Sequence, residues 1–147
     1  MIIDVRKLKY SGKYDSEFTC YYTPSEGIIS LPGAVLNGQV CVTGTLALHG
    51  DDVYVDGTVS CKIVGECARC LKSAEYNFSS NFSVVYATER QDEDDYLYTR
   101  GLVDLTPAVN DVLLTDFPTV IYCKENCKGI CPVCGQDLNE SSCDCKY

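Results

Sequence analysis

The sequence has no long apolar run, a single histidine and few basic residues. No window approaches the eighteen or more apolar residues of a membrane span, and the opening stretch MIIDVRKLKYSGKYD lacks an apolar run of signal-peptide length. We therefore expect a cytoplasmic protein with no place in a membrane. The 147 residues match the size of one ordinary domain, which can bury a core without a covalent staple.

Basic residues are scarce. Twelve Lys and Arg stand against twenty-one Asp and Glu, which gives a formal net charge of -9. Because nucleic-acid binding over a broad basic face depends on Lys and Arg, this balance argues against that mode and favours a basic protein partner. Six cations nevertheless lie near cysteines, where they either lower thiol pKa values or form a small, local RNA contact: Lys62, Arg69, Lys72, Lys124, Lys128 and Lys146.

Groups for catalysis are also few. His49 is the only histidine, and the sequence HGDD around it indicates a solvated turn. There is no glycine-rich loop for a phosphate, and no Ser-His-Asp or Cys-His arrangement that His49 would complete. The acids of QDEDD at 91–95 indicate a solvated part of a mobile loop over 88–100. We assign no catalytic residue and expect no enzyme.

Cysteine, by contrast, is abundant, with eleven residues. In a reducing compartment disulfides are rare, and an odd number fits a disulfide framework poorly. Three cysteines stand alone within predicted strands, where a free thiol packs as a small apolar group: Cys20, Cys41 and Cys61. The other eight form four close pairs: Cys67 and Cys70, Cys123 and Cys127, Cys131 and Cys134, Cys143 and Cys145.

Eight paired thiols are what two tetrahedral four-thiolate zinc sites require. In CPVCG at 131–135, Pro132 stiffens the turn and Gly135 can take a positive φ after the second ligand. We expect Cys131, Cys134, Cys143 and Cys145 to close a local site, and Cys67, Cys70, Cys123 and Cys127 a site that spans a longer loop. A different assignment, in which Cys127 joins the tail site, stays open.

Alternating apolar residues predict strands over 38–48, 53–65 and 76–87, the first two joined as a hairpin. Edge strands are expected in IIDVRKL and at 17–22. One helix is expected near 106–116, with Thr106 as N-cap, Pro107 at its first position and Pro118 ending it. The fold class is therefore α+β, an antiparallel sheet or partly closed barrel with one main helix. We place a strand-rich domain at 1–122 and a zinc-knuckle tail packed on it at 123–147.

These motifs together resemble a known family. CARCL at 67–71, the acidic loop, VDLTPAVNDVLL at 103–114 and CKGICPVCGQDLN at 127–139 with a following C-x-C are similar to the YceD family, the large ribosomal RNA subunit accumulation proteins. The resemblance implies a cytosolic bacterial or plastid protein without an assigned catalytic activity. It also implies a link, by gene neighbourhood, to a small protein of the large ribosomal subunit. Some members carry only the CxRC pair and a later His or Cys pair, at the positions of Cys67, Cys70, Cys123 and Cys127, and lack the CPxCG tail. This supports the grouping given above.

The leading hypothesis is a non-enzymatic ribosome-assembly factor that holds two structural zinc ions and binds a ribosomal protein or a precursor of the large subunit. One alternative is a rubredoxin-like iron protein or a dithiol redox protein, since CPVCG suits either. Zinc is favoured over iron because CARCL lacks the glycine after its second cysteine. A hydrolase with an open metal position is a further alternative, and all-cysteine sites argue against it.

Overall fold

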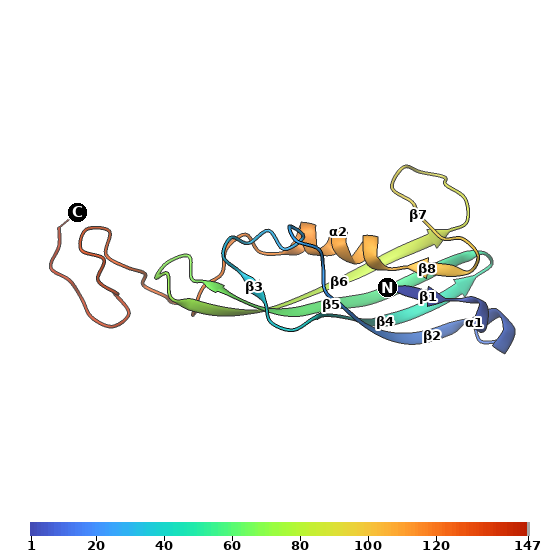
Figure 1. The fold of residues 1–147 in the computed structure, drawn as a ribbon, viewed down its shortest axis with the longest axis horizontal. Coiled ribbons are helices and arrows are strands. Elements are labelled where there is room, and N and C mark those ends of the chain that lie inside the picture. The colour runs from blue at the N-terminus through green and yellow to red at the C-terminus, as the bar shows by residue number, and fades with distance from the viewer. Residues whose placement is uncertain (147) are drawn as a thin grey trace.

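The computed structural model describes residues 1–146 as an elongated α+β protein (Figure 1). Its elements follow one another along the chain: β1 (Ile2–Asp4), α1 (Arg6–Ser11), β2 (Asp15–Tyr22), β3 (Val35–Leu36), β4 (Val40–His49), β5 (Asp52–Glu66), β6 (Ser73–Ala87), β7 (Tyr96–Leu97), β8 (Leu102–Asp104) and α2 (Thr106–Asp116). Neither helix within residues 1–146 is long and apolar enough to cross a membrane.

The main sheet is open. Its strands run in the order β2-β4-β5-β6-β7, and β3 pairs with the far part of β5. All these pairings are antiparallel except that of β6 with the short β7. The three predicted strands and the hairpin are confirmed, since His49 pairs with Asp52 across the β4–β5 turn. Of the two sheet forms expected from the sequence, the structure has the open one.

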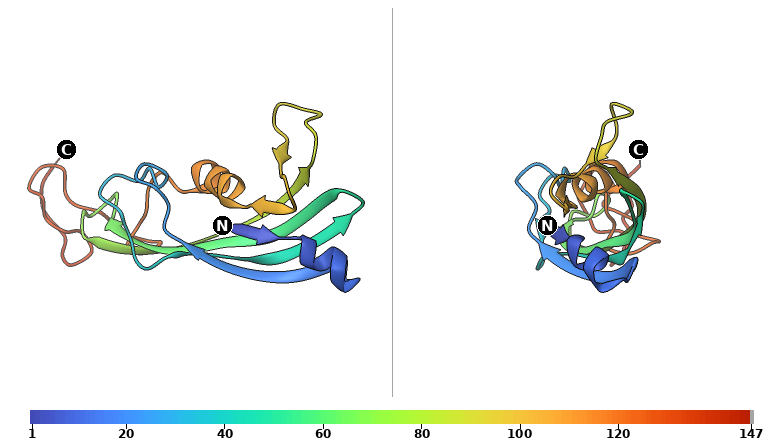
Figure 2. Two further views of the ribbon diagram at one scale, coloured as in Figure 1. Left: turned by 45° about the vertical axis from the view of Figure 1, so that its right-hand side comes forward. Right: turned by 90° about the vertical axis from the view of Figure 1, so that its right-hand side faces the viewer.

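The predicted alternation gives the sheet one buried face. On β4 and β5 every residue expected on the apolar face is buried: Val40, Val42, Leu46, Leu48, Val53, Val55, Val59, Cys61 and Ile63. On β6 the residues Phe78, Phe82 and Tyr86 are buried, whereas Tyr76, which shares their face, is 37% exposed. Helix α2 lies in the hollow of this twisted sheet and covers the buried face (Figure 2).

Two paired glycines allow β4 and β5 to approach closely. Gly44 pairs with Gly57, and a Cβ on Gly44 would lie 2.2 Å from the carbonyl oxygen of Asp56. The ring of Phe82 covers Gly57 so closely that a Cβ there would lie 2.8 Å from it. Only glycine permits this approach of the two strands.

The N-terminal segment differs from its prediction. Only Ile2–Asp4 forms a strand, which pairs with β8 in a separate two-stranded sheet, and the following residues form α1 instead of an edge strand. The Asp4 carboxylate explains the change, because it accepts hydrogen bonds from the backbone N–H and the side chain of Arg6 and so starts a turn. The second predicted edge strand, at 17–22, is confirmed as part of β2.

Helix α2 occupies the predicted residues, with Ala108, Val109 and Leu113 buried, but Thr106 is not its N-cap. Leu105 holds that position, and the Thr106 hydroxyl accepts a hydrogen bond from the Met1 nitrogen at 2.7 Å instead. The helix ends at Asp116, two residues before Pro118, as predicted. Tyr22 of β2 donates its hydroxyl hydrogen to the Asn110 side chain and so links the sheet to the helix.

The acidic loop over 88–100 is partly ordered by backbone pairing that the sequence did not reveal. Its second half contains β7, and Tyr98 is buried. The Tyr96 hydroxyl donates to Asp111 on α2, and the Tyr98 hydroxyl donates to the carbonyl of Asp51. The acidic part protrudes from the end of the sheet (Figure 1).

Candidate metal centres

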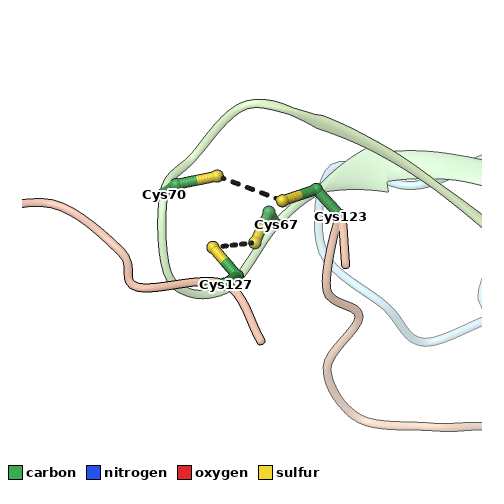
Figure 3. Close-up of side chains that lie close together, drawn as sticks. All are labelled: Cys67, Cys70, Cys123 and Cys127. Carbon is green, nitrogen blue, oxygen red and sulfur yellow. Dashed lines mark hydrogen bonds between the residues drawn. The ribbon is translucent and has the colours of Figure 1, made fainter. Parts of the chain in front are cut away.

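The first cluster lies where β5 turns into β6. Cys67 follows β5 directly, Cys70 precedes β6, and Cys123 and Cys127 come from the segment after α2. A backbone bond from Ala68 N–H to the carbonyl of Ile121, 2.9 Å long, holds the two segments together. Figure 3 shows all four sulfur atoms pointing toward one another.

The sulfur spacing fits a tetrahedral metal site. The sulfurs of Cys67 and Cys127 are 3.8 Å apart, those of Cys70 and Cys123 are 3.5 Å apart, and all four lie within 4.8 Å of one another. Ligands at about 2.3 Å from a zinc ion would be separated by about 3.8 Å. A disulfide needs about 2.05 Å, and all eleven cysteines are free thiols. The cluster could therefore hold a metal ion.

The second cluster is formed within the tail. Cys131, Cys134, Cys143 and Cys145 place their sulfurs within 4.8 Å of one another, so this set could also hold a metal ion. Cys131 is buried, Cys134 is exposed, and the other two are half-buried. The structure thus gathers the eight paired cysteines in the grouping favoured by spacing, and Cys127 stays with the first cluster.

The CARCL and CPVCG turns share one backbone pattern. In each, the first cysteine donates its N–H to the residue five positions on, Lys72 or Gln136, at 2.8 Å. The residue four positions on donates back to the carbonyl of the first cysteine at 2.9 Å. In each, the residue two positions on directs its N–H at the sulfur, 3.5 Å from Arg69 to Cys67 and 3.4 Å from Val133 to Cys131. The two turns therefore have the same backbone geometry, that of a knuckle.

The residue after the second cysteine does not distinguish the two knuckles. The missing glycine after Cys70 was expected to favour zinc over iron. Leu71 stands at that position with a φ of 61°, close to the 73° of Gly135 in the other knuckle. The backbone takes the left-handed conformation in spite of the side chain, at a cost of about 1 kcal/mol. Leucine therefore gives the same knuckle as glycine, and its presence does not discriminate between the two metals.

The first thiol of each knuckle has a lowered pKa, which favours its thiolate form. Burial raises the pKa of Cys67, but backbone N–H groups directed at its sulfur outweigh this effect and lower the pKa to about 6. Backbone N–H groups of Cys134 and Val133 likewise lower the pKa of Cys131 to about 6. Since metals bind the thiolate form, these N–H groups favour binding at neutral pH.

An ion-pair cluster joins the two knuckles. The Lys72 ammonium, just after the first knuckle, lies 2.7 Å from the carboxylate of Asp137 and also contacts Glu140. The Asp137 side chain is only 12% exposed, and its hydrogen bond with Lys72 lowers its pKa to about 2. The same two carboxylates raise the pKa of Lys72. The loop of the tail cluster is thus anchored to the hairpin that carries the first cluster.

Asn139 and Arg69 add contacts at Cys127. The Asn139 amide Nδ2 lies 3.4 Å from the Cys127 sulfur, and its Oδ1 accepts a bond from Lys128 N–H at 2.9 Å. The Arg69 guanidinium donates to the Cys127 carbonyl at 3.0 Å and stacks over the ring of Tyr122. Asn139 was not predicted from the sequence as a site residue, although its place in CKGICPVCGQDLN was the available signal.

The remaining candidates lie apart from both clusters. Cys61 is buried in the core and its pKa is raised by burial, while Cys20 and Cys41 are half-buried. This agrees with packing roles. His49 is exposed at the end of β4, with its ring edge-on to Tyr54. It stands at the opposite end of β5 from Cys67.

The fold and the sites define an α+β protein with an open, mostly antiparallel sheet, one main helix and two four-cysteine clusters. Residues 55–147 match the family model of the large ribosomal RNA subunit accumulation protein YceD. The chain belongs to the YceD family.

Individual relatives are distant. An uncharacterized protein of Mycobacterium leprae is 32% identical over 60% of this chain and 44% of its own length. YlbN of Bacillus subtilis is 28% identical over 67% of this chain and 60% of its own length. The chloroplastic YCED homolog 1 of Arabidopsis thaliana, named as a large ribosomal RNA subunit accumulation protein, is 25% identical over 62% of this chain and 39% of its own length. The chain thus spans less than two thirds of each of these relatives. No solved structure matches it.

Proposed function

We propose that this chain is a non-enzymatic factor in the accumulation of large-subunit ribosomal RNA, acting in ribosome assembly in the cytoplasm. The observation that carries the proposal is the pair of closed four-sulfur clusters in a chain of the YceD family. Closed all-cysteine clusters suit structural metal ions, which stabilise a fold without taking part in chemistry.

The metal in each cluster is proposed to be zinc, bound by Cys67, Cys70, Cys123 and Cys127 in one and by Cys131, Cys134, Cys143 and Cys145 in the other. The sulfur spacing and the lowered pKa values of Cys67 and Cys131 support binding of a divalent ion as the thiolate complex. Iron stays the alternative, because both knuckles direct N–H groups at sulfur in a way that suits either metal. The purified protein distinguishes the two, since ferric thiolate is red and zinc thiolate is colourless.

A non-enzymatic role is supported by the composition of the clusters. A catalytic zinc keeps a position for water or substrate, whereas four thiolates fill a tetrahedron. His49, the one histidine, stands at the other end of a fifteen-residue strand from the first cluster. A hydrolase would require a water ligand on one of the two ions.

The proposed partner is a basic ribosomal protein or a protein-rich face of a large-subunit precursor. Residues 62–75 and 123–146, around the clusters, hold six Lys and Arg and six Asp and Glu, so the whole net charge of -9 lies on the rest of the chain. A local RNA contact near the clusters is the other possibility. Lys72 is already paired with two carboxylates, and Arg69 is bound to Cys127 and Tyr122, which leaves fewer cations free for phosphate.

We also propose that residues 123–147 act as a zinc-binding tail packed on a strand-rich domain, 1–122. The hydrogen bond of Arg69 with the Cys127 carbonyl and the ion pair of Lys72 with Asp137 support this packing. Tyr147 lies outside the described residues.

Two measurements test the proposal. Elemental analysis of the purified chain should give two zinc ions, unchanged in the Cys61→Ala variant because Cys61 belongs to neither cluster. Affinity capture from cells, with identification of bound protein and RNA, should recover components of the large ribosomal subunit. The zinc sites would be excluded if the chain held no metal and all eight cluster thiols could be titrated. The assembly role would be excluded if the captured material contained no ribosomal components.

A further inference from the structure

Strand β2 forms one edge of the main sheet, and its hydrogen-bonding directions can be derived. The Tyr14 carbonyl accepts a bond from Leu48 N–H at 2.7 Å, in register with the β2–β4 pairing. In an antiparallel pair, residues alternate between those that bond to the neighbour and those that face away. The N–H and C=O groups of four residues therefore point away from β4: Asp15, Glu17, Thr19 and Tyr21.

These outward groups are available. Within residues 1–146, β2 pairs with β4 alone, and no other backbone group bonds to the outward row. The only further contact is from the Ser16 hydroxyl to the Glu17 carbonyl. All four side chains are exposed, including the 63% exposed ring of Tyr21. The eight-residue strand β2 thus has one unpaired edge, formed by the outward groups of these four residues.

The strands beside this edge carry no positive charge. From residue 14 to residue 61, which covers β2, β3, β4 and most of β5, the sequence has no Lys or Arg and six carboxylates. Two of these carboxylates, Asp15 and Glu17, lie on β2 itself, and Lys13 just before β2 is the nearest cation along the chain. An added strand would therefore meet a net negative charge on β2 and its neighbouring strands.

We infer that the β2 edge binds a basic, extended peptide segment, which joins the sheet as an additional strand. The inference rests on the proposed class of partner, a basic protein, and specifies where and how it is held. Backbone bonds to the outward row would supply affinity, and Lys or Arg side chains of the segment would lie beside Asp15 and Glu17.

A second copy of this chain offers the edge no charge complementarity. Two β2 strands paired antiparallel would carry four carboxylates and no cation, with Asp15 opposite Tyr21 and Glu17 opposite Thr19. A basic strand would bring cations to the same carboxylates, so the charge of β2 favours it over a second copy.

The test uses a synthetic eight-residue peptide that alternates Lys with Thr and Val, measured by fluorescence anisotropy with the metal-loaded chain. Binding should be detectable below about 1 mM. A peptide N-methylated at two adjacent central residues, which blocks both edges of the strand, should bind at least about tenfold more weakly, because backbone hydrogen bonds are lost. A peptide with Glu in place of Lys should not bind. Equal binding of the methylated peptide would overturn strand addition.

Protein variants locate the site. Thr19→Pro removes an outward N–H while sparing every bond to β4, and proline is tolerated on an edge strand. It should weaken the Lys peptide by about tenfold. Glu17→Gln should weaken it a few-fold, and Glu125→Gln, a matched loss of charge beside the metal clusters, should leave it unchanged. Should Thr19→Pro misfold, the methylated peptide and Glu17→Gln still decide the question.

Cell capture separates this inference from the proposed function. If Thr19→Pro still recovers ribosomal components at the wild-type level, the β2 edge is not the docking site, although the assembly role stands. If the wild-type chain recovers none, the assembly role fails whatever the peptides do. Sedimentation of the wild-type chain as a dimer that Thr19→Pro converts to a monomer would assign the edge to a second copy and overturn the inference.

Discussion

The side-chain amide of Asn139 donates to the Cys127 sulfur across 3.4 Å, although Asn139 belongs to the loop between the two cysteine pairs of the other cluster. The backbone N–H of Lys128 fixes the amide by donating to its oxygen. Each cluster therefore helps to position the other.

Replacing Asn139 with Ala should weaken metal binding in the first cluster by about tenfold, because contacts to ligand atoms tune metal affinity. Competition with a chelator measures the affinity, and cadmium NMR assigns the loss to one of the two clusters. Asn77→Ala, an exposed amide on β6 with no such contact, is the control. Unchanged affinity at both clusters would show that they bind independently.

Loss of a ligand should have different effects in the two clusters. Cys70→Ser should destabilise the whole fold, because its cluster closes a loop of more than fifty residues between β5 and the segment after α2. Cys143→Ser should mainly loosen the residues after Cys131 and, through Asn139, weaken the first cluster. Hydrogen exchange measures both effects. Global loosening by Cys143→Ser with little effect of Cys70→Ser would reverse the assignment.

Replacing Leu71, whose backbone is strained, should raise the stability of the CARCL knuckle. Leu71 is 60% exposed and has a φ of 61°, so Leu71→Gly should stabilise the metal-loaded chain by about 1 kcal/mol. The reciprocal change, Gly135→Ala at a φ of 73°, should destabilise the tail knuckle by a similar amount. Thermal unfolding with zinc in excess measures both. A loss of stability in Leu71→Gly would mean that the leucine side chain has a contact that outweighs the strain.

The close approach of β4 and β5 depends on Gly44. Gly44→Ala would place a methyl group 2.2 Å from the Asp56 carbonyl, within the backbone of the neighbouring strand, and should cost about 3 kcal/mol. Urea unfolding measures this cost. Thr45→Ala, the next residue on the exposed face, should cost far less, and similar losses for the two would argue against a special role for the glycine.

The acidic loop should speed association with a basic partner. Asp95 accepts two backbone bonds within the loop and Asp92 one, so the informative change is Glu93→Gln with Asp94→Asn, which leaves the loop's hydrogen bonds intact. Association with purified large-subunit precursors should slow a few-fold at low salt, with little difference at high salt, because salt screens surface charges beyond about 8 Å. Glu125→Gln with Asp144→Asn is the control of equal charge. A slower rate in the control alone would place the steering charges near the clusters.

The sheet and both clusters were predictable because each has a short-range signature. Alternation in β4, β5 and β6 marks the buried face, and paired cysteines mark the knuckles. The contacts made by Asn139 and Lys72 were not predictable, since polar residues near a metal site resemble ordinary loop residues until the fold brings them together. The prediction of Thr106 as the N-cap of α2 was wrong for a related reason. Its hydroxyl suits a helix cap, but a distant backbone nitrogen binds it instead.

The place of the first cluster also sets an order of folding. Cys67 and Cys70 form the turn of the β5–β6 hairpin, so this hairpin can close from its turn outward with contacts that are local in sequence. Cys123 and Cys127 become available only after fifty more residues have been made, and their capture is the long-range step. During synthesis, the two thiols of the hairpin turn therefore remain without their partners until α2 and the first five residues of the tail have been made.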